Sequence, residues 1–158
     1  MWKITVAFLL FVLLAVNGES EMNKKKEREL CPSGWKKYER QCYKLFKIKR
    51  NWNEAEKLCV GSKGHLVSVH KPAVNAFLKT FLQNRASHIW IGGYYATQRA
   101  AWTWRDGSKF GYTNWNAKPA VARNNKKCVL ATSSKGALRW RRELCSAHFY
   151  FVCSKTAK

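Results

Sequence analysis

Acidic residues are scarce in this chain: its 158 residues include nine Asp and Glu against 30 Lys and Arg, a net charge of +21. Between Cys31 and Cys153 there are 23 basic residues and five acidic ones, so the charge belongs to the folded part of the chain. The five are Glu39, Glu54, Glu56, Asp106 and Glu143. A chain this basic repels itself on folding and attracts polyanions at raised rates.

Patterns typical of catalysis are missing as well. The five acidic residues of the domain offer no obvious general acid/base pair. The four histidines are scattered, and none lies in an HExxH or similar motif. They are His65, His70, His88 and His148. We therefore predict a binding protein rather than an enzyme.

The N-terminal residues are typical of a secretory signal peptide. Met1-Trp2-Lys3 is a short basic segment, residues 4–16 form an almost unbroken apolar stretch, and Val16-Asn17-Gly18 brings small residues at the usual cleavage spacing. We predict a signal peptide over residues 1–18 and a secreted, extracellular protein. A signal anchor that stays in the membrane is the alternative, although the stretch is too short to span a bilayer well.

Cysteine patterns typical of zinc sites are absent, because neither CxxC nor a Cys/His cluster with zinc-ligand spacing occurs. Six cysteines follow the predicted signal peptide, at positions 31, 42, 59, 128, 145 and 153. An even number in a secreted chain indicates three disulfides, and spacing alone allows fifteen pairings. We expect oxidised cysteines, with no metal site and no cofactor.

Hydrophobic periodicity predicts two helices. The first follows Asn51, which forms a capping box with Glu54, and ends at Gly61 and Gly64. Its apolar positions are Trp52, Ala55, Leu58 and Cys59. The second helix has Pro72 in its first turn and ends at Asn84. Its apolar stripe consists of Val74, Phe77, Leu78, Phe81 and Leu82.

Strands and loops fill the rest of the chain. Alternation predicts a hairpin over residues 37–46 and a turn at 105–108. Further strands are expected at residues 65–69, 89–93, 101–104, 128–131, 137–141 and 149–153. Residues 110–127 show no periodicity, and a long loop of this kind in a compact domain is usually functional or disordered. A polar, charged segment at 19–30 precedes the domain, and a short basic tail at 154–158 follows it.

Many landmarks of one family occur in order between residues 31 and 153. They are Cys31-Pro32-Ser33-Gly34-Trp35, Cys42-Tyr43, Trp52 with Ala55 and Cys59, His65-Leu66-Val67-Ser68, Trp90-Ile91-Gly92-Gly93, Trp104 with Asp106-Gly107, Asn114-Trp115, Cys128, Trp140 with Cys145, and Phe151-Val152-Cys153. This order resembles the C-type lectin-like domain. The compact layout is similar to that of regenerating-protein, ladderlectin-type and snake-venom lectins.

The resemblance implies an α+β fold in which two helices pack on small antiparallel sheets beside a long loop region. It also implies the disulfides Cys31–Cys42, Cys59–Cys153 and Cys128–Cys145, the first of which marks the long form of the domain. The second closes a long loop, which entropy models value at roughly 4 to 5 kcal/mol. In the family pattern His65 precedes a buried strand, and we expect it to be structural.

Calcium-dependent members of this family hold Ca²⁺ through carboxylate and amide oxygens, and the ion needs about six to eight oxygen ligands. When the chain is aligned on its cysteines and on Pro119, the ligand positions hold other residues. They are Lys118, Ala120, Lys126, Arg141 and Arg142. Lys and Arg donate hydrogen bonds and accept none. The resemblance thus implies no Ca²⁺ at this site, no calcium-bridged sugar binding, and a cis peptide bond before Pro119.

The same residues predict a basic patch. We expect Lys118, Lys126, Arg141 and Arg142 to converge, with Arg123, Lys127 and Arg139 nearby. Such a cluster suits sulfate, phosphate or carboxylate groups, which arginine binds bidentately. The alternative is a diffuse basic surface, because 23 basic residues place several near any chosen site.

Three functions fit this sequence. The first is a calcium-independent, carbohydrate-binding lectin for anionic or sulfated glycans, with heparin as the simplest case. The second is an antimicrobial, innate-defence protein that acts on bacterial envelopes through cell-surface polymers or acidic lipids. The third is a matrix or mineral-associated structural protein, which the lack of acidic patches disfavours. Nucleic acid would bind this charge too, but the predicted secretory route makes it a poor candidate for the natural partner. The sequence leaves the oligomeric state open.

Overall fold

The computed structural model describes residues 31–83, 85–117, 125–134 and 136–158. The predicted signal peptide, the charged segment at 19–30 and the predicted helix end at Asn84 lie outside these residues. The described elements are β1 (Lys36–Tyr38), β2 (Gln41–Arg50), α2 (Trp52–Gly61), β3 (His65–Leu66), α3 (Pro72–Leu82), β4 (His88–Ala96), the 3₁₀ turn η1 (Thr97–Arg99), β5 (Ala101–Trp104), β6 (Cys128–Ser134), β7 (Ala137–Glu143) and β8 (Phe149–Thr156). Within this part of the chain, no helix is long and apolar enough to cross a membrane.

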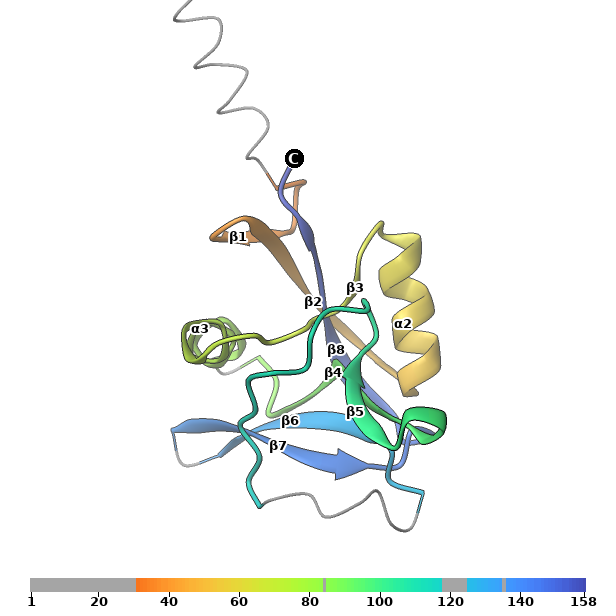
Figure 1. Cartoon of the computed structure of the whole chain (residues 1–158). Coiled ribbons are helices and arrows are strands. Elements are labelled where there is room, and N and C mark those ends of the chain that lie inside the picture. Colours follow the sequence, from red (N-terminus) through yellow and green to blue (C-terminus); the bar gives the residue numbers. More distant parts are fainter. Residues whose placement is uncertain (1–30, 84, 118–124, 135) are drawn as a thin grey trace, which may run out of the picture.

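The strands form one mixed sheet in the order β1-β2-β8-β4-β6-β7, with β3 paired to β8 and β5 paired to β4. The described pairings are antiparallel except that between β4 and β8, which is parallel and joins the two halves of the sheet. Helices α2 and α3 lie on opposite sides of the central strands β2 and β8, and β7 lies at the end far from the C terminus (Figure 1). The predicted α+β fold with two helices is confirmed.

Helix α2 begins as its capping box predicts. Asn51 Oδ1 accepts a hydrogen bond from Glu54 N at 2.9 Å, and Glu54 Oε2 accepts one from Asn51 N at 3.2 Å. A side-chain cap of this kind stabilises a helix by about 1 kcal/mol, because it satisfies N–H groups that have no partner within the helix.

The buried face of α2 differs from the prediction at one position. Ala55 and Cys59 are fully buried, whereas Leu58 is 38% exposed. Successive residues are spaced about 100° apart around a helix, so Leu58 lies more than a quarter turn away from Cys59. Its place in the predicted apolar stripe is therefore wrong, and Glu56 occupies the buried position instead.

Helix α3 has Pro72 in its first turn, as predicted. Val74, Leu78 and Leu82 are buried against the sheet. Phe77 and Phe81 are partly buried on the same side, with their rings stacked 5.6 Å apart.

Strand β3 is shorter than predicted, because it covers His65–Leu66 and not residues 65–69. Val67 N donates to Val152 O at 2.9 Å, while Val67 O accepts from Gly92 N at 2.9 Å. Val67 and Val69 are fully buried. The segment therefore lies in the core, but it bonds to two different strands instead of continuing one ladder.

Each face of the sheet carries its own core cluster. Residues of α3 pack with Trp104 and Trp140 on one face, and residues of α2 pack with Trp90 and Phe151 on the other. Burial of a large apolar side chain contributes about 1.5 to 3 kcal/mol. The cluster beside α3 reaches β7, so it fixes the strand on which the predicted basic patch depends.

The three disulfides are those that the resemblance implies. The Cα atoms are 5.5 Å apart in Cys31–Cys42, 5.4 Å in Cys59–Cys153 and 5.2 Å in Cys128–Cys145. Cys59–Cys153 ties α2 to β8. Cys128–Cys145 ties the start of β6 to the segment after β7 and so frames the site described below.

Candidate functional site

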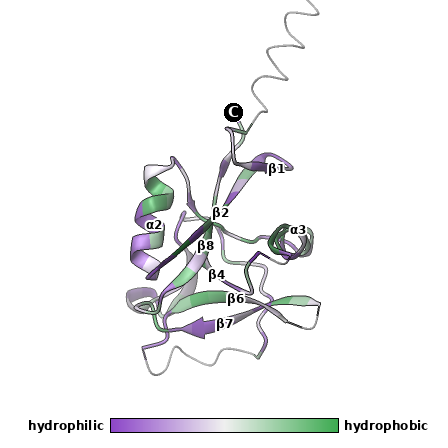
Figure 2. Cartoon of the chain, turned by 180° about the vertical axis from the view of Figure 1, so that it is seen from behind, coloured by the Kyte–Doolittle hydropathy of each residue, from purple (hydrophilic) through white to green (hydrophobic). Residues whose placement is uncertain are grey.

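The end of β7 borders a shallow hollow of about 220 Å³, lined by Trp115, Asn116, Ala117, Lys126, Trp140, Arg141 and Arg142. Three of these residues, Lys126, Arg141 and Arg142, are cations predicted to converge. In Figure 2, β6 is coloured as hydrophobic over most of its length, whereas the arrowhead end of β7 is hydrophilic. The edge strand β7 thus brings polar and charged side chains to this end of the sheet.

Residues 114–116 pair with the outer edge of β7, which is the last strand of the sheet. Trp115 forms a parallel bridge with Trp140, Asn116 N donates to Trp140 O at 2.8 Å, and Trp140 N donates to Asn114 O at 2.9 Å. The fully buried Trp140 ring packs against the Trp115 ring, with centroids 5.8 Å apart. Pairing on both edges therefore fixes the backbone that leads into Arg141.

Arg141 shares a face of β7 with Glu143, because alternate residues of a strand point the same way. Arg141 Nη1 lies 2.5 Å from Glu143 Oε2, and Glu143 Oε1 accepts from Leu144 N at 3.0 Å. The Arg141 side chain is still 42% exposed, against 12% for Glu143. Arg141 thus keeps solvent-facing donors. The sequence prediction omitted Glu143 from the site, although its position two residues after Arg141 in a strand places it there.

Two other predicted members of the patch turn away from the hollow. Lys127 Nζ donates to Thr97 Oγ1 at 3.1 Å, and Lys127 O accepts from Tyr95 N at 2.7 Å. Arg139 Nη1 donates to Asn114 Oδ1 at 2.7 Å. Neither cation lines the hollow. The remaining residues of the prediction lie outside the described part of the chain; they are Lys118, Pro119, Ala120 and Arg123. The predicted cis bond before Pro119 lies outside it as well.

The electrostatic field of the site reaches His88, in β4. Partial burial lowers the pKa of His88, the positive charge of Arg141 lowers it further, and the carboxylate of Glu143 acts in the opposite direction. The pKa of His88 is lowered overall. Burial is the largest cause of this lowering, and the effect of Arg141 on the His88 pKa is larger than the opposing effect of Glu143.

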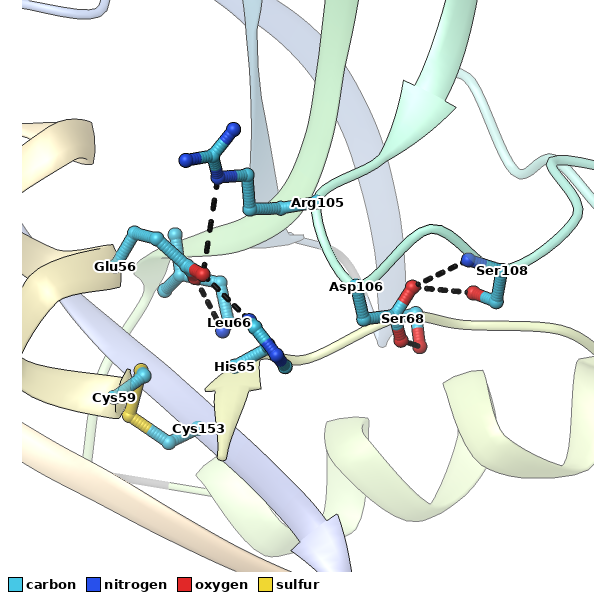
Figure 3. Close-up of polar contacts among 9 residues, drawn as sticks. All are labelled: Glu56, Cys59, His65, Leu66, Ser68, Arg105, Asp106, Ser108 and Cys153. Carbon is cyan, nitrogen blue, oxygen red and sulfur yellow. Dashed lines mark hydrogen bonds and ion pairs between the residues drawn. A yellow bond between two sulfur atoms is a disulfide. The ribbon is translucent and has the colours of Figure 1, made fainter. Parts of the chain in front are cut away.

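A polar network anchors the turn that leads into the long loop (Figure 3). Ser68 Oγ donates to Asp106 Oδ2 at 2.6 Å, and Ser108 N donates to Asp106 Oδ1 at 2.9 Å. Burial opposes ionisation of Asp106, but the hydrogen bonds from Ser108 and Ser68 bring its pKa below the ordinary value. The predicted turn at residues 105–108 is thus organised around an ionised carboxylate.

A second set of contacts surrounds Glu56, which is 5% exposed (Figure 3). Its carboxylate accepts from Leu66 N at 2.9 Å, lies 2.6 Å from His65 Nδ1, and lies 3.9 Å from Arg105 Nε. These contacts tie α2 to β3 and to the residue that follows β5. His65 therefore has the structural role that the resemblance implied.

Calcium ligands are scarce among the described side chains of the hollow. Ca²⁺ requires oxygen ligands, and among the described lining residues Asn116 alone has a side-chain oxygen, whereas Lys126, Arg141 and Arg142 carry N–H donors alone. The neighbouring Glu143 carboxylate is engaged by Arg141 and by Leu144 N. Across residues 31–83, 85–117, 125–134 and 136–158, no group of three or more His, Cys, Asp or Glu is placed to hold a metal ion.

The chain matches the Lectin C-type domain over residues 48–155. It is 32% identical over 161 residues to a C-type lectin of Cerberus rynchops, covering 97% of this chain and 98% of that one. It is 30% identical over 168 residues to regenerating islet-derived protein 3-gamma of Mus musculus, covering 96% of each. The structure of a calcium-independent type II antifreeze protein superimposes with a TM-score of 0.73 at 28% identity, covering 82% of this chain and 96% of that one. The chain therefore belongs to the C-type lectin domain family.

Proposed function

We propose that this protein is a secreted, calcium-independent lectin that binds anionic or sulfated glycans, such as heparin, through the hollow at the end of β7. The observation that carries the proposal is the placement of Lys126, Arg141 and Arg142 around one hollow, beside the indole rings of Trp115 and Trp140. Its role is binding rather than catalysis.

The lining groups suit complementary parts of a sulfated sugar. Arginine guanidinium groups bind sulfate through paired N–H donors, and lysine adds a mobile point charge. Small-ligand sites generally combine apolar surface with a few polar groups. Trp140 is fully buried, so the partly buried Trp115 is the ring available to a sugar face.

The donor chemistry supports binding without calcium, since the three cations that line the hollow offer N–H donors and no oxygen ligand. The antifreeze neighbour is itself described as calcium-independent. Secretion is supported by the three disulfides, which persist in oxidising compartments. Binding should be unchanged by EDTA, and it should weaken steeply with salt, because screening and counterion release act on every polyanion contact.

The double variant Arg141→Gln/Arg142→Gln tests the site. We expect it to lose roughly tenfold or more of the affinity for a heparin-derived hexasaccharide, since two charge-assisted contacts are removed. Calorimetry in low salt, with and without EDTA, measures the loss. The matched control is Lys57→Gln/Lys79→Gln, which removes the same charge from two exposed residues that lie on α2 and α3.

Equal losses in the two double variants would reject the hollow and leave a diffuse basic surface. Loss of wild-type binding in EDTA would reject calcium independence. A leakage assay distinguishes the antibacterial alternative from glycan recognition. It uses vesicles made of phosphatidylglycerol and phosphatidylcholine at physiological salt. Leakage by wild type and by the Arg141/Arg142 variant alike would favour action on envelopes over glycan recognition.

A further inference from the structure

A second cationic groove lies at the opposite end of the molecule from β7. It has a volume of about 530 Å³ and is lined by Pro32, Gly61, Ser62, Lys63, Lys155, Thr156 and Lys158. None of these lining residues is acidic. The groove lies where α2 and β8 end, near the C terminus, whereas β7 lies at the other end of the molecule (Figure 1). We call it the lysine groove.

Lys155 is held in place within the lysine groove. Its Nζ donates to Ser62 O at 3.0 Å and lies 4.1 Å from the centre of the Trp35 ring. A cation over an indole face is attracted by the ring's negative face. An ammonium group already fixed in this way loses little side-chain freedom when it binds a ligand, so binding costs less.

The positive charges in the groove repel one another. Burial lowers the pKa of Lys155, and the charges of Lys63, Lys158 and Lys44 lower it further. An anion placed among these ammonium groups would relieve the repulsion. The side chains that line the groove thus carry three positive charges, on Lys63, Lys155 and Lys158, and no negative one.

The backbone of Lys63 has an uncommon conformation. It has φ of 61°, in the left-handed region, directly after α2. Lys63 N donates to Val60 O at 2.9 Å and Gly64 N donates to Cys59 O at 3.0 Å, a pattern that favours glycine at the left-handed position. A residue with a side chain is disfavoured there. The chain nevertheless places a cation at this position, beside the groove.

The groove also continues beyond its own lining. Lys63, Lys155 and Thr156 line a neighbouring hollow of about 460 Å³ as well, to which Lys71 contributes. Two carboxylates also line this second hollow: Glu39, which pairs with Lys71 at 2.8 Å, and Asp106. An extended ligand thus has room to run on from the groove, with its strongest attraction at the lysine groove itself.

We propose that the lysine groove is a second anion-binding site, which takes a sulfate group of a sulfated polysaccharide. Together with the hollow at β7, it lets one chain bind two polysaccharide segments from opposite ends and so bridge them. The bridging rests on the proposed function of the hollow, whereas the affinity of the lysine groove for sulfate groups is independent of it.

The site is tested with Lys63→Gln/Lys158→Gln, which spares Lys155 because Lys155 also satisfies Ser62 O at the end of α2. Titration of ¹⁵N-labelled protein with a heparin-derived hexasaccharide should shift the Trp35 indole N–H and the Ser62 amide in wild type and in Arg141→Gln/Arg142→Gln. The Lys63/Lys158 variant should lose these shifts. Lys57→Gln/Lys79→Gln should keep them.

Bridging is measured by the turbidity of heparin-coated particles. We expect the Lys63/Lys158 variant to need at least tenfold more protein than the Lys57/Lys79 control, and the Arg141/Arg142 variant to fail as well. Absence of shifts at Trp35 and Ser62 in wild type would overturn the groove. Undiminished bridging by the Lys63/Lys158 variant would overturn bivalency. If the Arg141/Arg142 variant binds and bridges like the control, the proposed site in the hollow is rejected. The shifts at Trp35 still test anion binding in the lysine groove.

Discussion

Arg141 and Glu143 together set the charge of the hollow at β7. Their ion pair places the Glu143 carboxylate 2.5 Å from Arg141 Nη1, yet the guanidinium stays exposed and still lowers the pKa of His88. An exposed pair of this kind contributes little to stability, with a median near 0 to 1 kcal/mol. Its effect on the site is orientation, because the pair holds the guanidinium along the strand.

His88 therefore reports the charge at Arg141. We predict that Arg141→Gln raises the pKa of His88, because a repulsive positive charge is removed. A hexasaccharide bound in the hollow should raise it as well, since its sulfates offset the same charge. NMR titration of the imidazole resonances between about pH 5 and pH 8 measures both effects. Lys57→Gln is the control. A His88 titration unmoved by Arg141→Gln would show that Arg141 does not act on this ring.

At the scale of elements, Asn75 joins α3 to the strand that carries the site. Its side chain donates from Nδ2 to Leu138 O at 3.0 Å and accepts at Oδ1 from Trp140 Nε1 at 3.1 Å. Asn75 is 7% exposed. A buried polar group deprived of its partner costs about 1 to 3 kcal/mol. The Trp140 indole N–H depends on the Asn75 amide in this way, whereas Leu138 O also accepts from Asn114 Nδ2 at 2.7 Å.

We predict that Asn75→Ala lowers the free energy of unfolding by roughly 1 to 3 kcal/mol, because it leaves the buried Trp140 indole N–H without its partner, whereas Leu138 O keeps the hydrogen bond from Asn114 Nδ2 at 2.7 Å. Urea unfolding followed by fluorescence measures the change. Asn53→Ala, at an exposed position of α2, is the control and should change stability by no more than about 0.5 kcal/mol. A loss no larger than that of the control would mean that water replaces the amide at the Trp140 indole N–H.

The elements were predictable where local chemistry fixes them. The capping box of Asn51 and Glu54 and the proline at the start of α3 determine helix ends without help from the rest of the fold. The prediction was wrong where distant partners decide. Leu58 matched the apolar spacing, but the sheet packs against a face that includes Glu56 instead. Val67 makes one backbone hydrogen bond to β8 and one to β4, an arrangement that no local pattern reveals.

At the scale of the whole molecule, the basic patch was predictable in type but only partly in membership. Alignment on the cysteines grouped Lys126, Arg141 and Arg142, and all three line the hollow. That they bind a ligand together stays a prediction. Lys127 and Arg139 leave it because Thr97 and Asn114, distant in the sequence, accept their hydrogen bonds. Composition could not show which of the basic residues line the hollow.

The excess charge predicts an unusual response of stability to salt. Without ligand, raising NaCl from about 20 mM to about 500 mM should raise Tm by several degrees, because salt screens repulsion among the basic residues. At low salt a saturating heparin-derived hexasaccharide should raise Tm further, by binding the native state. That increment should vanish as salt weakens binding, so the curves with and without ligand converge at high salt. Differential scanning fluorimetry with neutral dextran as control measures both. A Tm that falls with salt in the absence of ligand would show that ion pairs within the fold already neutralise the basic residues. Such pairing would remove the electrostatic attraction for anions at either end of the molecule.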